Sequence, residues 1–199
     1  PARVSLVTAD TGRDRAAVPA LAAFAEQFAI PVIEHRQRYL NLPADHPCHL
    51  GYNPGLVLGD ADAVLVIDCD VPWTPSRQAP SPECQVIHIG VDPLFSRYPI
   101  RGFAADVAIT GASRLVLPAL GRALQPLAEE STIKARRARI AGQREAMQAD
   151  WRKLRDEDLL TQDIRDGHLA GRVVNIPAAL IADADGHVPP DTIMAINDE

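Results

Sequence analysis

Two stretches of this chain predict its fold: Ala61-Asp-Ala-Val-Leu-Val-Ile-Asp-Cys-Asp70 and, after a proline-rich loop, Gln85-Val-Ile-His-Ile-Gly-Val-Asp92. Each contains a continuous apolar run that ends in acidic residues. Such runs suit parallel strands buried on both faces, and the ligand crevice of an open parallel sheet lies beyond the carboxyl ends of its strands. We therefore expect Asp68, Asp70 and Asp92 to lie at a binding edge.

The first 125 residues alternate between strand-like and helix-like patterns. Strands are predicted at 3–8, 30–35, 63–67, 86–91 and 107–110, and helices at 16–28, 53–58 and 112–124. Strands that alternate with helices form crossovers and a parallel sheet. The sequence thus predicts an α/β fold, a Rossmann-like parallel sheet of about five to six strands flanked by helices.

The remaining residues predict two further parts. Residues 126–160 carry charges of both signs and predict a long linker helix. Its apolar residues recur every seven positions: Ile133, Ile140, Met147 and Leu154. This narrow stripe indicates docking on another surface, with a coiled coil as the alternative. Residues 161–199 predict a proline-led helix and a short strand, which we interpret as the truncated start of a second α/β domain because a new strand needs partners at its edges.

The composition excludes several classes of protein. Of the 199 residues, 47% are hydrophobic and 23% are charged, as in an ordinary globular protein. A net charge of -6 gives no support for binding nucleic acid, which draws on concentrated positive charge. No apolar run reaches the ~20 residues that a membrane span needs, and no secretory signal is recognisable. We therefore expect a cytoplasmic protein without a membrane partner.

Some features have both a functional and a structural interpretation. Asp92 follows a predicted strand, where dinucleotide folds place a ribose-binding acid, but Asp-Pro at a strand end also starts turns. The turn Thr11-Gly-Arg13 offers amides and a cation to a phosphate, although without a full glycine-rich pattern we favour a structural turn. His46-Pro-Cys-His49 contains metal-ligand residue types, but no second cluster completes a coordination sphere. With no nucleophile elbow or Ser-His-Asp order, the residues predict a binding-type domain.

Five segments form a set that points to a family. They are the first strand with Thr11-Gly-Arg13, Leu42-Pro-Ala-Asp-His-Pro-Cys-His-Leu-Gly51, Ala61-Asp-Ala-Val-Leu-Val-Ile-Asp68, Asp70-Val-Pro-Trp-Thr-Pro75 and Val86-Ile-His-Ile-Gly-Val-Asp-Pro93. Together they resemble the central domain of thiamine-diphosphate-dependent enzymes, and the nearest group is the acetolactate synthase large-subunit type. The resemblance covers residues 1–125, and the His-Pro-x-His-x-Gly segment is its most specific element.

The resemblance implies a division into domains. Residues 1–125 would be the central Rossmann-like domain, 126–160 the linker, and 161–199 the truncated start of the diphosphate-binding domain. A pyrimidine-binding domain would precede the chain. Thiamine diphosphate and Mg²⁺ would be held outside this chain, which alone would have no catalytic residues and be inactive. The intact homodimer or homotetramer would act on a 2-oxo acid, by decarboxylation with carbon–carbon bond formation or cleavage.

The resemblance also implies a nucleotide site, because the central domain binds FAD in some family members and ADP in others. The residues at the matching positions are Thr11, Gly12, Arg13, His49, Gly51, Asp70 and Asp92. The glycine-rich first loop of the FAD-binding members is reduced here to Gly12. One alternative is a stand-alone nucleotide-binding or regulatory Rossmann-like module. Another is a sirtuin-type enzyme, whose catalytic His and zinc-binding cysteines are not recognisable in the sequence.

Overall fold

The computed structural model describes residues 3–156, with side chains up to residue 153. The chain divides into a first compact unit, Pro1–Arg144, and a second, Glu145–Glu199, of which the end of one helix is described. The elements in chain order are β1 (Val4–Thr8), η1 (Thr11–Arg13), α1 (Ala17–Phe28), β2 (Val32–Glu34), α2 (Gly55–Leu58), β3 (Ala63–Ile67), β4 (Gln85–Gly90), β5 (Val107–Thr110), α3 (Ser113–Leu124), η2 (Gln125–Leu127) and α4 (Glu130–Asp156).

The five strands form one sheet in the order β2-β1-β3-β4-β5, and every pairing is parallel. Leu6 of β1, for example, lies opposite Val32 of β2 on one side and Leu65 of β3 on the other. The predicted α/β fold with a parallel sheet is thereby confirmed. In this doubly wound order the chain changes direction between β1 and β3, so the crevice for a ligand is expected above their carboxyl ends.

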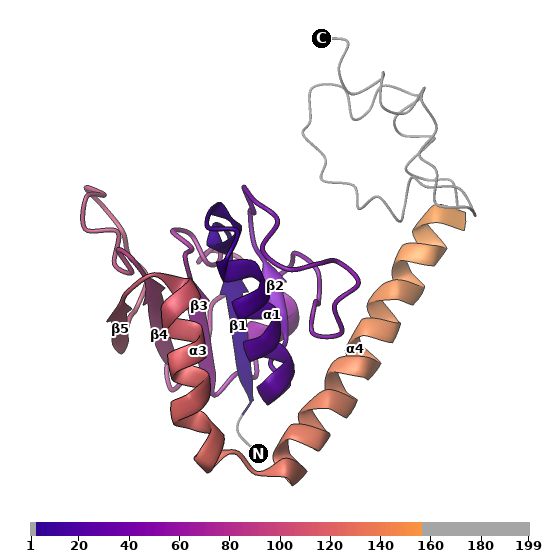
Figure 1. Cartoon of the computed structure of the whole chain (residues 1–199). Coiled ribbons are helices and arrows are strands. Elements are labelled where there is room, and N and C mark those ends of the chain that lie inside the picture. Colours follow the sequence, from indigo (N-terminus) through magenta and orange to yellow (C-terminus); the bar gives the residue numbers. More distant parts are fainter. Residues whose placement is uncertain (1–2, 157–199) are drawn as a thin grey trace. The chain divides into compact units, whose positions relative to one another are not determined.

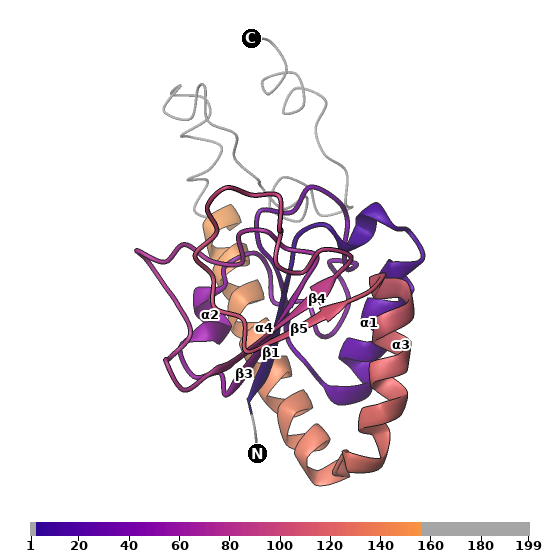
Figure 2. The same ribbon diagram turned by 90° about the vertical axis from the view of Figure 1, so that its left-hand side faces the viewer.

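Each face of the sheet has its own hydrophobic core. Leu6, Leu65 and Ile67 belong to the core beneath α1 and α3, whereas Val7 and Val66 belong to the core of the opposite face. Figure 1 shows α1 and α3 side by side, and Figure 2 shows α2 on the other side of the sheet. Because both faces of the strands are covered, the loops at the strand ends are left to form a site.

Helix α1 shows how the sequence produces this packing. Leu21, Phe24 and Phe28 recur at steps of three and four residues, and all three are buried against the sheet. Pro19 lies in the first turn of the helix. Backbone amides there have no acceptor within the helix, so the N–H that proline lacks costs no helical hydrogen bond. The helix ends at Ala29, whose left-handed φ of 48° turns the chain toward β2.

The part of α4 up to residue 144 packs within the first unit. Ile140 is buried in the same core as α1, and three arginines donate to backbone carbonyl oxygens. The contacts are Arg136 with Phe28 O at 3.4 Å, Arg137 with Glu26 O at 3.4 Å, and Arg144 with His46 O. Two of these acceptors lie in the last turn of α1, where carbonyl groups lack helical donors. The predicted second domain at 161–199 lies outside the described residues.

Candidate functional site

A cavity of about 540 Å³ lies at the carboxyl edge of the sheet, and we call it the edge cavity. Its walls come from the residues that follow β1, β3 and β4 and from the start of α3. Among the described residues, the charged side chains of its lining are Asp10, Arg13, Asp14, Asp68, Asp92 and Arg97. The edge cavity thus occupies the place where the strand order predicts a ligand crevice.

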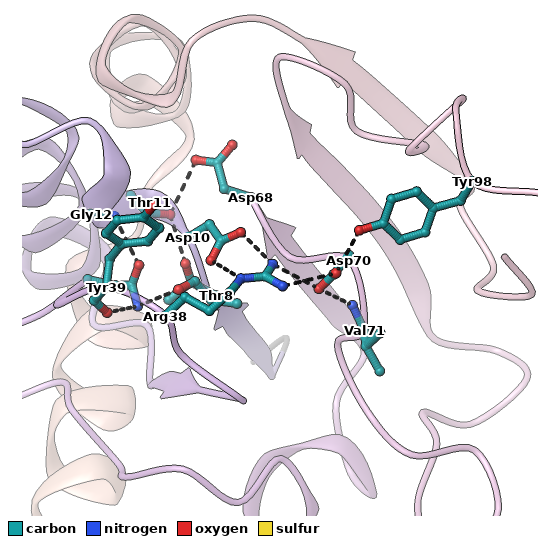
Figure 3. Close-up of polar contacts among 12 residues, drawn as sticks. Thr8, Asp10, Thr11, Gly12, Arg38, Tyr39, Asp68, Asp70, Val71 and Tyr98 are labelled. Atoms are coloured by element: carbon teal, nitrogen blue, oxygen red, sulfur yellow. Dashed lines mark hydrogen bonds and ion pairs between the residues drawn. The ribbon is translucent and has the colours of Figure 1, made fainter.

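Asp68, directly after β3, is held in a strained conformation with a φ of 45°. Its Oδ2 accepts hydrogen bonds from Ser113 Oγ and from Thr11 Oγ1. Figure 3 shows the bond from Thr11, which is 3.3 Å long. A Cβ atom at Gly90 would lie 2.8 Å from Asp68 Oδ1, so the glycine leaves room for this carboxylate. Burial raises the pKa of Asp68, although the two hydroxyl donors oppose the shift.

Arg38 connects the ends of β1 and β3, as Figure 3 shows. Its Nε donates to Asp10 Oδ1 at 2.8 Å, and its Nη1 donates to Asp70 Oδ2 at 3.3 Å. The Tyr98 hydroxyl donates to the same Asp70 oxygen at 3.0 Å. Burial acts to raise the pKa of Asp70, but the bonds from Arg38 and Tyr98 lower it below its usual value. Asp70, a predicted site residue, is therefore engaged in an ion-pair network and is not a lining residue of the edge cavity.

A second arginine, Arg101, fixes the loop after β4. Its Nε donates to Asp70 O at 3.1 Å, and its Nη2 lies 3.2 Å from His88 Nδ1. The other ring nitrogen of His88 lies 3.0 Å from Ala104 O, which requires the proton to be on Nε2. Burial and the Arg101 guanidinium lower the pKa of His88 to about 4, so the ring is neutral at pH 7. His88 serves here to position Arg101.

The turn η1 contains three predicted site residues, and the amides of Gly12, Arg13 and the following Asp14 are hydrogen-bonded within the chain. The bonds run from Gly12 N to Asn41 Oδ1 at 2.9 Å, from Arg13 N to Asp10 O at 3.0 Å and from Asp14 N to Thr11 O at 3.3 Å. A Cβ atom on Gly12 would lie 1.9 Å from Leu40 O, so this glycine permits a close approach of two loops. These contacts support the interpretation of the segment as a structural turn. The residues Thr11 and Arg13 nevertheless line the edge cavity.

Asp92 lines the edge cavity as well, and it also organises the turn after β4. Its carboxylate oxygens lie 3.0 and 3.1 Å from Ser96 N, and Ser96 Oγ donates to Oδ2 at 3.2 Å. Both interpretations of Asp92 therefore have support in the geometry. The side chain caps a turn, and the same residue is part of the cavity lining.

His49 and Gly51 lie beside β2 and are not lining residues of the edge cavity. Gly51 N donates to His49 Nδ1 at 3.3 Å, and Gly51 has a φ of 78° that favours glycine. His49 Nε2 is 3.4 Å from Glu34 Oε1, within ion-pair distance but without hydrogen-bond geometry. The structure thus places these two predicted site residues apart from Thr11, Arg13 and Asp92.

Several polar residues of this edge were missed as candidates. Asn41 is fully buried, and its Nδ2 lies 3.0 Å from Ala9 O and 3.1 Å from Glu34 Oε2. Arg38 and Ser113 were missed too, because their partners lie 28 or more residues away in sequence. The acidic strand end that includes Asp68 was the one signal that the sequence offered.

The described residues offer no obvious metal centre. Within residues 3–156, no group of three or more His, Cys, Asp or Glu side chains is arranged to hold a metal ion. Cys48, Cys69 and Cys84 are buried free thiols, and burial raises the pKa of Cys48 to about 11 and of Cys69 to about 12. Such thiols are protonated at pH 7 and are poor metal ligands. None of the described helices is both long enough and apolar enough to cross a bilayer.

Residues 2–120, more than half of the chain, match the thiamine pyrophosphate enzyme central domain. The chain belongs to this family. The central domain extends over the whole parallel sheet and most of α3. The predicted resemblance to the central domain of thiamine-diphosphate-dependent enzymes is thereby confirmed.

Among solved structures, 32 chains are similar to the present chain. One of them, from Mycobacterium smegmatis, is named as a candidate thiamin diphosphate-dependent enzyme; it is 23% identical, with a TM-score of 0.49. The match covers 60% of the present chain and 24% of that chain, so the present chain spans about a quarter of that protein's length. A search of curated proteins found no match.

Proposed function

We propose that this central domain is part of a thiamine-diphosphate-dependent enzyme that acts on a 2-oxo acid, of the acetolactate synthase type. The observation that carries the proposal is the family match over residues 2–120. Thiamine diphosphate supplies an electron sink for the loss of carbon dioxide from such substrates. The reaction class is a lyase or transferase reaction in which a carbon–carbon bond is broken or formed.

Within that enzyme, the chain has a structural role. As the family resemblance implies, we assign the cofactor and Mg²⁺ to a pyrimidine-binding and a diphosphate-binding domain that flank the central domain. We retain the division into 1–125, 126–160 and 161–199, with α4 as the connecting helix. A cytoplasmic homodimer or homotetramer is the assembly that accompanies this proposal.

The experiment is an assay of the full-length protein that contains this chain, with pyruvate and other 2-oxo acids, thiamine diphosphate and Mg²⁺. We expect release of carbon dioxide and formation of acetolactate from pyruvate, and no turnover by the 199-residue chain alone. Carbon dioxide release without acetolactate would overturn the synthase assignment. Failure of the full-length protein to turn over any 2-oxo acid would overturn the proposal as a whole.

A second candidate function is nucleotide binding in the edge cavity, with FAD or ADP as the ligand. Two observations favour it. The cavity lies at the carboxyl edge near the β1–β3 switch point, and its volume of about 540 Å³ falls in the ~300–1,000 Å³ range of ligand sites. Thr11, Arg13 and Asp92 are the predicted residues that line it. Calorimetric titration of the chain with FAD, ADP and NAD tests this function, and absence of saturable binding contradicts it.

A further inference from the structure

A second cavity, of about 460 Å³, lies between the sheet and the helices on one of its faces, and we call it the apolar cavity. Its floor consists of aliphatic side chains from β1, β3, β4 and β5: Val4, Ala63, Leu65, Ile87, Val107 and Ile109. Its other walls come from α1, α3, η2 and the start of α4. Among the described residues, none lines both this cavity and the edge cavity, so the two are separate sites.

The packing of α1 against α3 forms the wall opposite the sheet. A Cβ atom at Gly121 of α3 would lie 3.8 Å from Phe24 Cδ2 and 4.0 Å from Phe28 Cε2, so the two helices are in contact there. The rings of Phe24 and Phe28, with centroids 5.2 Å apart, both line the apolar cavity. After Leu124 the chain turns through η2 into α4, and Figure 1 shows this turn on the side of the sheet where β1 begins. An apolar space is thereby enclosed between the two layers.

The size of the apolar cavity is that of a ligand site. Protein interiors contain few voids larger than a water molecule, and larger apolar cavities bind apolar molecules. The volume falls in the ~300–1,000 Å³ range of small-molecule sites. The floor crosses four adjacent strands, which at ~4.8 Å between neighbours makes it roughly 14 Å long. These dimensions suit an extended alkyl chain.

Polar side chains enter the lining at one place, the start of α4. Among the described lining residues they are Glu129, Thr132 and Arg136, which are spaced by three and four residues and so lie on one side of the helix. Glu129 is exposed, and its Oε2 accepts a hydrogen bond from Thr132 Oγ1 at 3.4 Å. Arg136 is half-buried, and its Nη1 donates to Phe28 O at 3.4 Å. The guanidinium is thus the charged group nearer to the aromatic wall.

The surroundings of Arg136 favour an anion. Burial and the neighbouring Arg139 lower the pKa of Arg136. A carboxylate beside the guanidinium offsets both effects, because opposite charges stabilise each other's ionised forms. The planar guanidinium also matches the geometry of a carboxylate group. An aliphatic chain that ends in a carboxylate therefore complements both the floor and the polar edge of the cavity.

We propose that the apolar cavity binds a medium-chain aliphatic carboxylate, with its alkyl chain along the sheet and its carboxylate at Arg136. This site is additional to the proposed enzymatic reaction and to nucleotide binding in the edge cavity, and it depends on neither. Its ligand is recognised by two features that the described residues supply, an apolar floor across four strands and one half-buried cation.

The first test compares octanoate, 1-octanol and octylamine by calorimetric titration of the unaltered 199-residue chain at pH 7 and low ionic strength. We expect octanoate to bind about tenfold more tightly than octylamine and about threefold more tightly than 1-octanol, because the guanidinium attracts a carboxylate and repels an ammonium group. Octylamine as the tightest ligand would assign the charged contact to Glu129 and overturn the carboxylate assignment. Equal affinities of octanoate and 1-octanol overturn it as well, and no saturable binding of any of the three at millimolar concentration overturns the site.

The second test changes the length of the chain. Each buried methylene should strengthen binding about fourfold, so octanoate should bind more than tenfold more tightly than hexanoate. Equal affinities of the two carboxylates would show that the alkyl chain is not buried, which overturns the proposal. Both tests use the unaltered protein and do not depend on the folding of a variant.

The variant that fills the apolar cavity is Ala63→Leu, and Ala108→Leu is its matched control. Ala63 lines the cavity floor, whereas Ala108 is an exposed residue of β5 that lies outside the lining. We expect Ala63→Leu to weaken octanoate binding at least about tenfold without a loss of Tm, and Ala108→Leu to change it less than about twofold. Unchanged octanoate binding in a folded Ala63→Leu protein overturns the location of the site.

The contact with the carboxylate is tested by Arg136→Gln, with Arg122→Gln as the control. Arg122 is an exposed arginine of α3 outside the cavity lining. In Arg136→Gln we expect octanoate to lose its preference over 1-octanol, while 1-octanol affinity changes less than about twofold. A preference for octanoate that persists in this variant overturns the role of Arg136.

The outcome is separable from the proposed function. Failure of octanoate binding leaves turnover of 2-oxo acids by the full-length protein unaffected, and failure of that turnover leaves the affinities of the chain for octanoate and 1-octanol as valid measurements. Analytical ultracentrifugation covers a rival occupant of the cavity. Self-association of the chain that Ala63→Leu abolishes, without octanoate binding, would identify a second copy as the occupant and overturn the proposal.

Discussion

The Nε atom of Arg38 lies 2.8 Å from Oδ1 of Asp10, so that the loop after β2 is tied to the residue pair that follows β1. The same guanidinium reaches Asp70 after β3 at 3.3 Å. Arg38 thus joins three neighbouring strand ends at the point where the strand order reverses. A bidentate arginine is suited to this role because its donors are fixed in one plane.

Replacement of Arg38 by Ala should lower the free energy of unfolding by about 1 kcal/mol at pH 7, since the pair is partly exposed. Arg77→Ala, an exposed arginine on the proline-rich loop, is the control and should change little. Burial acts to raise the pKa of Asp70, but the bonds from Arg38 and Tyr98 lower it on balance. The stabilisation from Asp70 is therefore present above about pH 4 and lost below it. Urea unfolding of the unaltered protein and both variants at pH 7 and pH 3 measures the effect. A loss of unfolding free energy in Arg38→Ala that is larger at pH 3 than at pH 7 would contradict the prediction.

A methyl group at Gly12 should be strongly destabilising, because its Cβ would lie 1.9 Å from the backbone oxygen of Leu40. We expect Gly12→Ala to lose about 2 kcal/mol or more of unfolding free energy. The matched control is Gly142→Ala in α4, which has open space around the Cβ and should gain about 0.5–1 kcal/mol from helix propensity. Thermal denaturation of the two variants measures the effect. Equal shifts of Tm in both would contradict the close approach of the two loops at Gly12.

Truncation of Asn41 to Ala should be costly because its amide bridges buried groups. The side chain donates toward Ala9 O and Glu34 Oε2 and accepts from Gly12 N. Loss of these bonds leaves a buried carboxylate short of donors, for which we expect about 3 kcal/mol of destabilisation. Asn53→Ala removes an exposed bond to Gly55 N and should cost less than about 1 kcal/mol. Chemical unfolding of the two variants provides the comparison. Similar losses of unfolding free energy in both would mean that the buried bonds of Asn41 stabilise the fold no more than the exposed bond of Asn53.

Ile140 tests whether the first half of α4 is an integral part of the first unit. The side chain is 3% exposed, whereas Ile100 is 89% exposed. Ile140→Ala should therefore lower the unfolding free energy by about 2 kcal/mol, and Ile100→Ala by no more than about 0.5 kcal/mol. Hydrogen exchange of the α1 amides should accelerate in the first variant alone. Unchanged exchange there would show that α4 does not support the core.

His88 should make stability depend on pH in mildly acidic solution. Burial and Arg101 lower its pKa in the folded state to about 4, whereas the unfolded chain titrates near pH 6.5. The unfolded state therefore binds more protons between pH 6.5 and 4, so stability is full above about pH 6.5 and declines through this window as the pH falls. In His88→Gln the decline should be smaller by up to about 3 kcal/mol at pH 4. Unfolding curves from pH 7 to pH 4 measure the difference; parallel declines in both proteins would exclude His88 as the source.

The sheet was predictable from local pattern. The apolar run at 63–67 and its counterpart at 86–91 have the length and flanking turns of buried strands, and α1 follows from the spacing of Leu21, Phe24 and Phe28. A strand that is buried on both faces has a continuous apolar run in its own sequence. Such strands can therefore be predicted without knowing which distant residues they pair with. Asp68 was placed at the binding edge for the same reason.

Which residues line the edge cavity was harder to predict from the sequence. Asp70 and Asp92 have the same sequence context, an acid after an apolar strand, yet one pairs with Arg38 and the other lines the edge cavity. His49 and Gly51 belong to the most specific family segment but lie beside β2. Which strand ends face one cavity depends on strand order, and strand order depends on pairings between distant residues.

By itself, the sequence determined the alternation of strands and helices, the parallel sheet and the family, because hydrophobic periodicity and short motifs are local properties. The tertiary structure alone decided that Arg38 spans three strand ends, that Ser113 and Thr11 hold Asp68, and that Asn41 occupies the amide of Gly12. Those contacts join residues that are distant in the chain and meet only when the loops close over the sheet, where burial and hydrogen bonding select the partners.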